Sequence, residues 1–102
     1  MTKGYWVARV DVYDAEAYKG YVTNNAAAFR KFGGRFLVRG GAFELKEGMS
    51  RARNVVIEFP SYQAALDCFH SPEYQHALSF RRGAPSAADI IVIEGYDGPQ
   101  PE

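Results

Sequence analysis

The chain has 102 residues, enough for one domain and too few for two. Its 12 basic and 12 acidic residues cancel, so it lacks the basic excess typical of nucleic-acid-binding proteins. No apolar run has the length that a bilayer requires, and a single cysteine excludes an internal disulfide, so we expect a cytoplasmic protein that does not enter membranes. We assign residues 1–97 to one domain and residues 98–102 to a C-terminal tail.

The first predicted elements are a strand and a long helix. Apolar and more polar residues alternate from Gly4 to Val12, which is typical of a strand. Asp14 suits the N-cap of a helix that runs to about Phe32, where Gly33 offers the left-handed conformation common at helix ends. Apolar residues recur at helical spacing and predict one buried stripe: Tyr18, Tyr21, Val22, Ala26, Phe29 and Phe32.

Two further strands follow. The second runs from Arg35 to Gly40, and Ala42–Lys46 is a candidate continuation of it. The third, Arg53–Pro60, is expected to be the most buried strand of the sheet, because valine, isoleucine and phenylalanine suit a packed pleated surface. In this strand alternate residues point to opposite faces, with Val55, Ile57 and Phe59 on one side and Asn54, Val56 and Glu58 on the other.

The rest of the chain predicts a second helical region and a last strand. Ser61 is a suitable N-cap, and the sequence Ser71-Pro72-Glu73 is a second helix-start signal. Gly83 ends the region, and Asp89–Tyr96 is the fourth predicted strand.

The order strand, helix, strand, strand, helix, strand predicts an α+β, ferredoxin-like βαββαβ subunit. We expect a four-stranded antiparallel sheet with both helices on one face. The residues assigned to the covered face are Trp6, Ala8, Val10, Phe36, Val38, Val55, Ile57, Phe59, Ile91 and Ile93. The residues assigned to the bare face are Tyr5, Val7, Arg9, Leu37, Arg39, Asn54, Val56, Glu58, Val92, Glu94 and Tyr96.

The predicted bare face is too apolar for ordinary solvated surface, and a contiguous apolar patch usually marks a partner or ligand site. It also carries arginines and glutamates, which are costly to bury unless they are paired. Both features predict a homodimer in which two sheets face each other. The charges then form either an ion-pair network at the interface or a small-molecule site. Glu58 on this face argues against RNA binding, because a carboxylate repels phosphate.

Five stretches of the sequence resemble the domain-of-unknown-function-thirteen-thirty family of the dimeric α/β-barrel superfamily: residues 4–12, 35–41, 53–61, 71–74 and 94–96. The resemblance implies a ferredoxin-like subunit and a dimeric α/β barrel formed by two sheets. Related families in the superfamily include small monooxygenases, muconolactone isomerases and haem-dependent chlorite-degrading enzymes. No catalytic motif of theirs matches here residue by residue.

The charged residues of the bare face are our candidate ligand-binding and catalytic residues. Arg39 and Arg9 are expected to anchor an anionic ligand, because a guanidinium suits a carboxylate or enolate, and Asn54 to orient it. Glu58 and Glu94 are candidates for the general acid and base.

His70 is a further ligand-binding candidate at the edge of the site, although capping of a helix end is its ordinary role. The two histidines and Cys68 lack the spacing of metal ligands, so we expect neither a metal nor a haem or other cofactor.

The predicted function is therefore a small-molecule-binding protein, in one form a cofactor-independent enzyme that transfers protons on a small organic acid or aromatic compound. The alternative is a non-catalytic dimeric module, structural or ligand-sensing.

Overall fold

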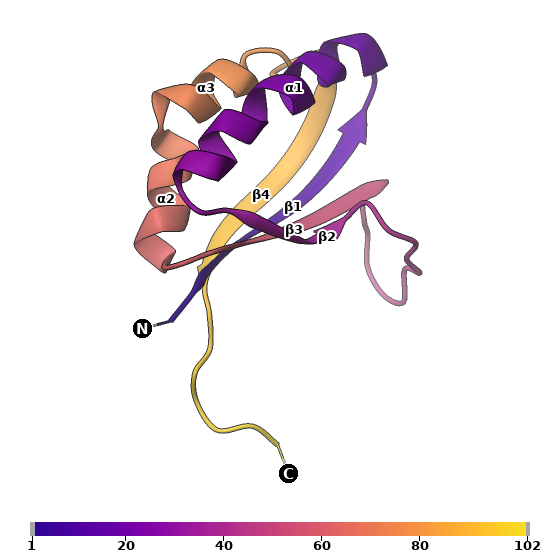
Figure 1. Ribbon diagram of the computed structural model, residues 1–102. Coiled ribbons are helices and arrows are strands. Elements are labelled where there is room, and N and C mark those ends of the chain that lie inside the picture. The colour runs from indigo at the N-terminus through magenta and orange to yellow at the C-terminus, as the bar shows by residue number, and fades with distance from the viewer. Residues whose placement is uncertain (1, 102) are drawn as a thin grey trace.

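A computed structural model describes residues 2–101 (Figure 1). Its elements in chain order are β1 (Gly4–Val12), α1 (Ala15–Lys31), β2 (Arg35–Arg39), β3 (Arg53–Phe59), α2 (Tyr62–His70), α3 (Pro72–Leu78) and β4 (Ser86–Glu94). The strands form one antiparallel sheet in the order β2-β3-β1-β4. The predicted α+β class and the four-stranded antiparallel sheet are confirmed.

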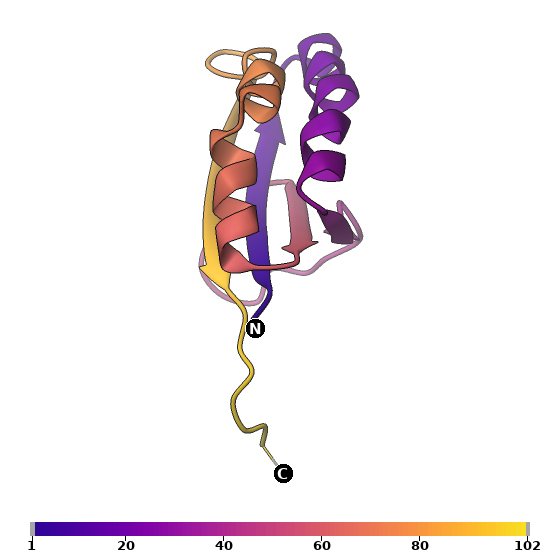
Figure 2. The same cartoon turned by 60° about the vertical axis from the view of Figure 1, so that its left-hand side comes forward.

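The helices lie on one face of the sheet, and no helix of residues 2–101 covers the other face (Figures 1 and 2). After β4 the chain leaves the body of the domain and runs away from the sheet (Figure 1). Within residues 2–101 no helix combines the length and the apolar character needed to cross a membrane.

Trp6 of β1 is the centre of the core between helices and sheet. Its side chain is 1% exposed and packs edge-on against Phe29 and Tyr74, at ring-centroid distances of 5.3 and 4.8 Å. The indole N–H donates to the carbonyl of Ala65 at 2.8 Å, so the one polar atom of this ring is satisfied inside the core. Trp6 thereby ties β1 to all three helices.

All three predicted helix-start signals, Asp14, Ser61 and Ser71, are used. The side chain of Asp14 accepts a hydrogen bond from the amide of Ala17 at 3.1 Å and begins α1. The second helical region is two helices, because Ser71 ends α2 and caps α3 by accepting from the amide of Tyr74 at 3.1 Å. The candidate continuation of the second strand is not a strand: residues 40–52 form an extended loop.

A β-bulge in β2 changes the predicted faces of two residues. Phe36 lies opposite Ile57 of β3, but Val38 lies opposite Val56 and Arg39 opposite Val55. The extra residue in this interval reverses the alternation that follows it. Val38 is therefore on the bare face, 44% exposed, and Arg39 is on the covered face; both assignments from simple alternation were wrong.

The predicted assignment of residues of the last strand to the two faces of the sheet was also wrong. Ile90 pairs with Ala8 and Val92 with Trp6, so these two side chains join the core. Ile91 and Ile93 point to the bare face and are 55% and 48% exposed. Four consecutive apolar residues contain no alternation, so the sequence alone could not set this phase.

Candidate functional site

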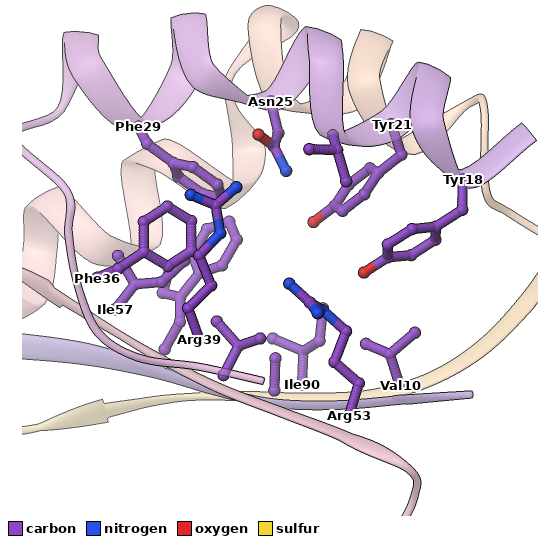
Figure 3. Close-up of a pocket in the computed structure, with 14 residues that line it drawn as sticks. Val10, Tyr18, Tyr21, Asn25, Phe29, Phe36, Arg39, Arg53, Ile57 and Ile90 are labelled. Carbon is purple, nitrogen blue, oxygen red and sulfur yellow. The ribbon is translucent and has the colours of Figure 1, made fainter. Parts of the chain in front are cut away.

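A pocket opens between α1 and the covered face of the sheet (Figure 3). The volume open to the centre of a water molecule is about 30 Å³, and the whole space between atoms, with its mouth, is about 440 Å³. A volume of about 30 Å³ has room for roughly two water molecules. An organic ligand therefore enters only when a side chain at the mouth moves. The lining residues are Trp6, Ala8, Val10, Tyr18, Tyr21, Val22, Asn25, Phe29, Phe36, Arg39, Arg53, Val55, Ile57 and Ile90.

The walls of the pocket are mostly aromatic and β-branched. Trp6, Phe29 and Phe36 form one continuous aromatic group, with centroids of Phe29 and Phe36 5.6 Å apart. Arg39 extends this wall at the mouth, since its guanidinium lies 4.1 Å above the ring centre of Phe36. A flat apolar molecule would find stacking surfaces on this side.

The charged groups of the pocket are both cations. Arg39 comes from β2 and Arg53 from the start of β3, where it pairs with Val10. The Nε atom of Arg53 is buried and has no hydrogen-bond partner among residues 2–101. Within residues 2–101, no carboxylate is in the lining. Since an unpaired buried guanidinium donor is costly, the pocket is suited to an anionic ligand.

The helix α1 supplies the neutral polar groups, Tyr18, Tyr21 and Asn25, which face the two arginines across the pocket (Figure 3). Burial, and to a lesser extent Tyr21, raises the pKa of Tyr18. Burial, and then Tyr74, raises the pKa of Tyr21. Both phenols therefore keep their protons near neutral pH and can donate hydrogen bonds to a ligand.

Of the sequence-predicted site residues, Arg39 alone lines this pocket. Arg9, Asn54 and Glu58 lie on the bare face, on the other side of the sheet. Arg9 donates to the carbonyl of Met49 at 3.3 Å, and Asn54 donates to the carbonyl of Arg51 at 3.4 Å. The carboxylate of Glu58 accepts a hydrogen bond from Tyr5 at 3.2 Å.

Glu94 and His70 lie apart from these three residues. Glu94 pairs with Gly4, so it is on the covered side of the sheet rather than on the bare face, and it accepts from the hydroxyl of Thr2 at 2.8 Å. The shared face predicted for Glu58 and Glu94 was therefore wrong. His70 is exposed at the end of α2 beside Phe69, 5.4 Å between ring centres.

An ion-pair network occupies the bare face. Arg51 contacts the carboxylates of Asp11 at 2.9 Å and Asp89 at 2.7 Å. A hydrogen bond from the amide of Ala52, and then one from Arg51, lower the pKa of Asp11. Arg51 is thus paired with two carboxylates, whereas the two arginines of the pocket have no ion pair among residues 2–101. Residues 2–101 contain no group of three histidine, cysteine or carboxylate side chains that could hold a metal ion.

Four polar residues that line the pocket were not predicted as site residues: Tyr18, Tyr21, Asn25 and Arg53. For two of them, a pattern in the sequence indicates a place in the site. Arg53 is two residues before Val55 in the same strand, so alternation places it on the covered face. Asn25 interrupts the apolar stripe of α1 four residues before Phe29, and a polar residue in such a stripe is a candidate for a site.

The fold and the pocket define a small α+β protein that holds aromatic walls and two cations between its longest helix and its sheet. The chain belongs to the family described as Domain of unknown function (DUF1330), which matches residues 3–96. The predicted family is thus confirmed. No curated protein matches the sequence.

Two solved structures show the same fold. The first is RPA0582, a protein of unknown function from Rhodopseudomonas palustris, with 22% identity, a TM-score of 0.72, and coverage of 95% of this chain and 85% of that one. The second is SnoaB, a cofactor-independent oxygenase from Streptomyces nogalater, with 18% identity, a TM-score of 0.62, and full coverage of both chains.

Proposed function

We propose that this protein binds a small, flat organic anion in the pocket between α1 and the sheet. The observation that carries the proposal is the buried Nε of Arg53, which has no partner among residues 2–101 and lies in a lining without a carboxylate. A carboxylate or phenolate would supply that partner. Arg39 is exposed at the mouth. In this proposal its side chain moves to admit the ligand and then contacts the negative charge of the ligand.

The aromatic walls support an aromatic ligand rather than a sugar or an aliphatic amine. The similarity to a cofactor-independent oxygenase supports, at the level of fold, chemistry on the bound molecule. Glu58 and Glu94 lie outside the pocket lining, so we do not assign them the proton transfer there. In this proposal Tyr18 and Tyr21 are the proton-bearing groups next to the ligand.

A second proposal concerns the bare face. Its exposed Ile91 and Ile93, with Val38 at the opposite edge of the same face, are apolar surface that no helix of residues 2–101 covers. We propose that a second copy of the chain covers it, which would complete the ferredoxin-like subunit as one half of a dimeric barrel. The strand order β2-β3-β1-β4 supports this arrangement. Arg9, Asn54 and Glu58 would then belong to the interface rather than to the ligand site.

The binding proposal is tested by titrating the protein with benzoate and following Trp6, the sole tryptophan of the chain and part of the pocket wall. We expect the fluorescence to change on binding. Arg53→Gln is expected to weaken binding roughly tenfold or more, because a hydrogen bond to a charged group contributes about 1.5–3 kcal/mol. Arg39→Gln is expected to weaken it less, since Arg39 is more exposed.

The matched control is Arg30→Gln, which removes an exposed arginine of α1 outside the pocket lining. It should bind benzoate as the unmodified protein does. Benzoate binding that is absent, or that is equal in the Arg53→Gln and Arg30→Gln variants, would contradict the proposal.

A further inference from the structure

Three buried polar side chains form a line that ends in the pocket. Arg81, which follows α3, donates from Nη2 to the hydroxyl of Tyr74 at 2.9 Å. The hydroxyl of Tyr74 is 3.0 Å from that of Tyr21, which lines the pocket. Arg81 is 6% exposed, Tyr74 is 0% exposed and Tyr21 is 7% exposed, so bulk water reaches little of this line.

The direction of the hydrogen bonds follows from counting donors and acceptors. A guanidinium can only donate, so the oxygen of Tyr74 is an acceptor toward Arg81. The O–H of Tyr74 is fully buried and needs an acceptor of its own. Among residues 2–101 the acceptor within reach is the oxygen of Tyr21. The line therefore runs from Arg81 to Tyr74 to Tyr21.

This direction leaves the hydrogen of the Tyr21 hydroxyl without an acceptor in the described chain. The hydroxyl points into the space between α1 and the sheet, toward the side from which Arg53 rises (Figure 3). Arg81 has no ion pair among residues 2–101, and its guanidinium also lies 4.7 Å from the ring centre of Tyr21. A buried cation that acts on Tyr21 both directly and through the hydroxyl of Tyr74 polarises the Tyr21 O–H and makes it a stronger donor.

We propose that the Tyr21 hydroxyl, oriented by Tyr74 and Arg81, binds a negatively charged oxygen of the ligand, so that the pocket selects acidic phenols and enols and holds them ionised. This inference rests on the binding function proposed above and names its ligand class. On binding, the O–H bond of the ligand breaks, its proton goes to the buffer, and the electron pair stays on the oxygen that faces Tyr21 and Arg53. Tyr21 contacts the ligand, whereas Tyr74 and Arg81 are positioning residues.

The experiment uses 4-nitrophenol, whose phenolate form is seen by its visible absorbance. The apparent pKa of the bound compound is measured by titrating its complex with the full-length protein. We expect the protein to lower this pKa relative to free 4-nitrophenol. Tyr21→Phe keeps the ring but removes the donor, and should weaken phenolate binding roughly tenfold and raise the bound pKa by about one unit.

Tyr74→Phe tests the orienting role, because it leaves Tyr21 in place but lets its hydrogen turn away from the pocket. We expect a shift of the bound pKa in the same direction and smaller than in Tyr21→Phe. Tyr13→Phe, at an exposed tyrosine outside the pocket lining, is the control and should leave the bound pKa unchanged. Thermal unfolding shows whether the Tyr21→Phe variant is folded. If it is not, the bound pKa of 4-nitrophenol is compared between Tyr74→Phe and Tyr13→Phe, and the inference requires a higher value in Tyr74→Phe.

Two results would overturn the inference: 4-nitrophenol that binds only in its neutral form or not at all, or a bound pKa that Tyr21→Phe and Tyr74→Phe leave unchanged. The benzoate titration separates this failure from failure of the binding function. If Arg53 is required for benzoate binding but Tyr21 has no effect on 4-nitrophenol, the binding function stands and the selection of phenols is wrong. If benzoate binding does not depend on Arg53, the binding function itself is wrong.

Discussion

Burial determines the chemistry of the single thiol. Cys68 of α2 is 0% exposed and lies in the core cluster with Trp6 and Tyr74. Burial, and to a lesser extent the nearby Glu73, raises the pKa of the Cys68 thiol from 9.0 to about 12. The thiolate is the reactive form of cysteine, so the native protein offers almost none of it at neutral pH.

We therefore expect Cys68 to resist alkylation by iodoacetamide at pH 8 in the native protein and to react fully in denaturant. The pKa of the Cys68 thiol is higher in the folded protein than in the unfolded chain, so above about pH 9 the thiol ionises more readily in the unfolded chain. The free energy of unfolding therefore falls as the pH rises from about 9 toward 12. Mass spectrometry of the alkylated protein measures the extent of reaction. Rapid modification of the native protein at pH 8 would show that the thiol is accessible.

At the scale of the element, Ser71 makes the junction between α2 and α3. Its hydroxyl donates to the carbonyl of Cys68 at 2.7 Å and accepts from the amide of Tyr74 at 3.1 Å. One buried side chain thus satisfies a free carbonyl at the end of one helix and a free amide at the start of the next. This junction also positions Tyr74, through which Arg81 is linked to the pocket.

Ser71→Ala should lower the free energy of unfolding by about 1–2 kcal/mol, the usual cost of losing an N-cap. Chemical denaturation followed by Trp6 fluorescence measures it. Ser79→Ala is the control: its hydroxyl donates to the carbonyl of His76 at an exposed site, and its loss should change stability by less than about 0.5 kcal/mol. Equal effects of the two substitutions would argue against a capping role for Ser71.

At the scale of the whole molecule, the two faces of the sheet differ in how their charges are matched. On the covered face the part of the pocket lining that the structure describes holds two arginines and no carboxylate. On the bare face Arg51 pairs with Asp11 and Asp89. Exposed apolar surface of this kind usually marks an interaction site, and a buried donor without a partner requires one from outside the chain, such as a water or a ligand.

If a second copy covers the bare face, Ile91→Lys should convert a dimer into a monomer, because the substitution places a cation from each chain in an apolar contact. Sedimentation velocity at several protein concentrations measures the change. Gln63→Lys, on the exposed surface of α2, is the control and should leave the dimer intact. A wild-type monomer at all concentrations, or a dimer that Ile91→Lys does not affect, would contradict the proposed interface.

Local signals in the amino-acid sequence specify most of the helices and strands and the α+β class. Caps at Asp14, Ser61 and Ser71 and the alternation in Gly4–Val12 are local signals, because they act within a few residues of the chain. They were enough to predict an antiparallel sheet with helices, the break at Ser71 and the burial of Trp6. Alternation with Val55 also places Arg53 on the covered face.

The tertiary structure alone decided which charges meet. The bulge that turns Arg39 toward the pocket depends on how β2 pairs with β3, and the phase of Ile90–Ile93 depends on how β4 pairs with β1. The line from Arg81 through Tyr74 to Tyr21 joins α3 and the residues after it to α1. Tyr21 and Tyr74 are 53 positions apart in the sequence. Strand register and helix packing are long-range contacts, and no pattern within a single segment specifies them.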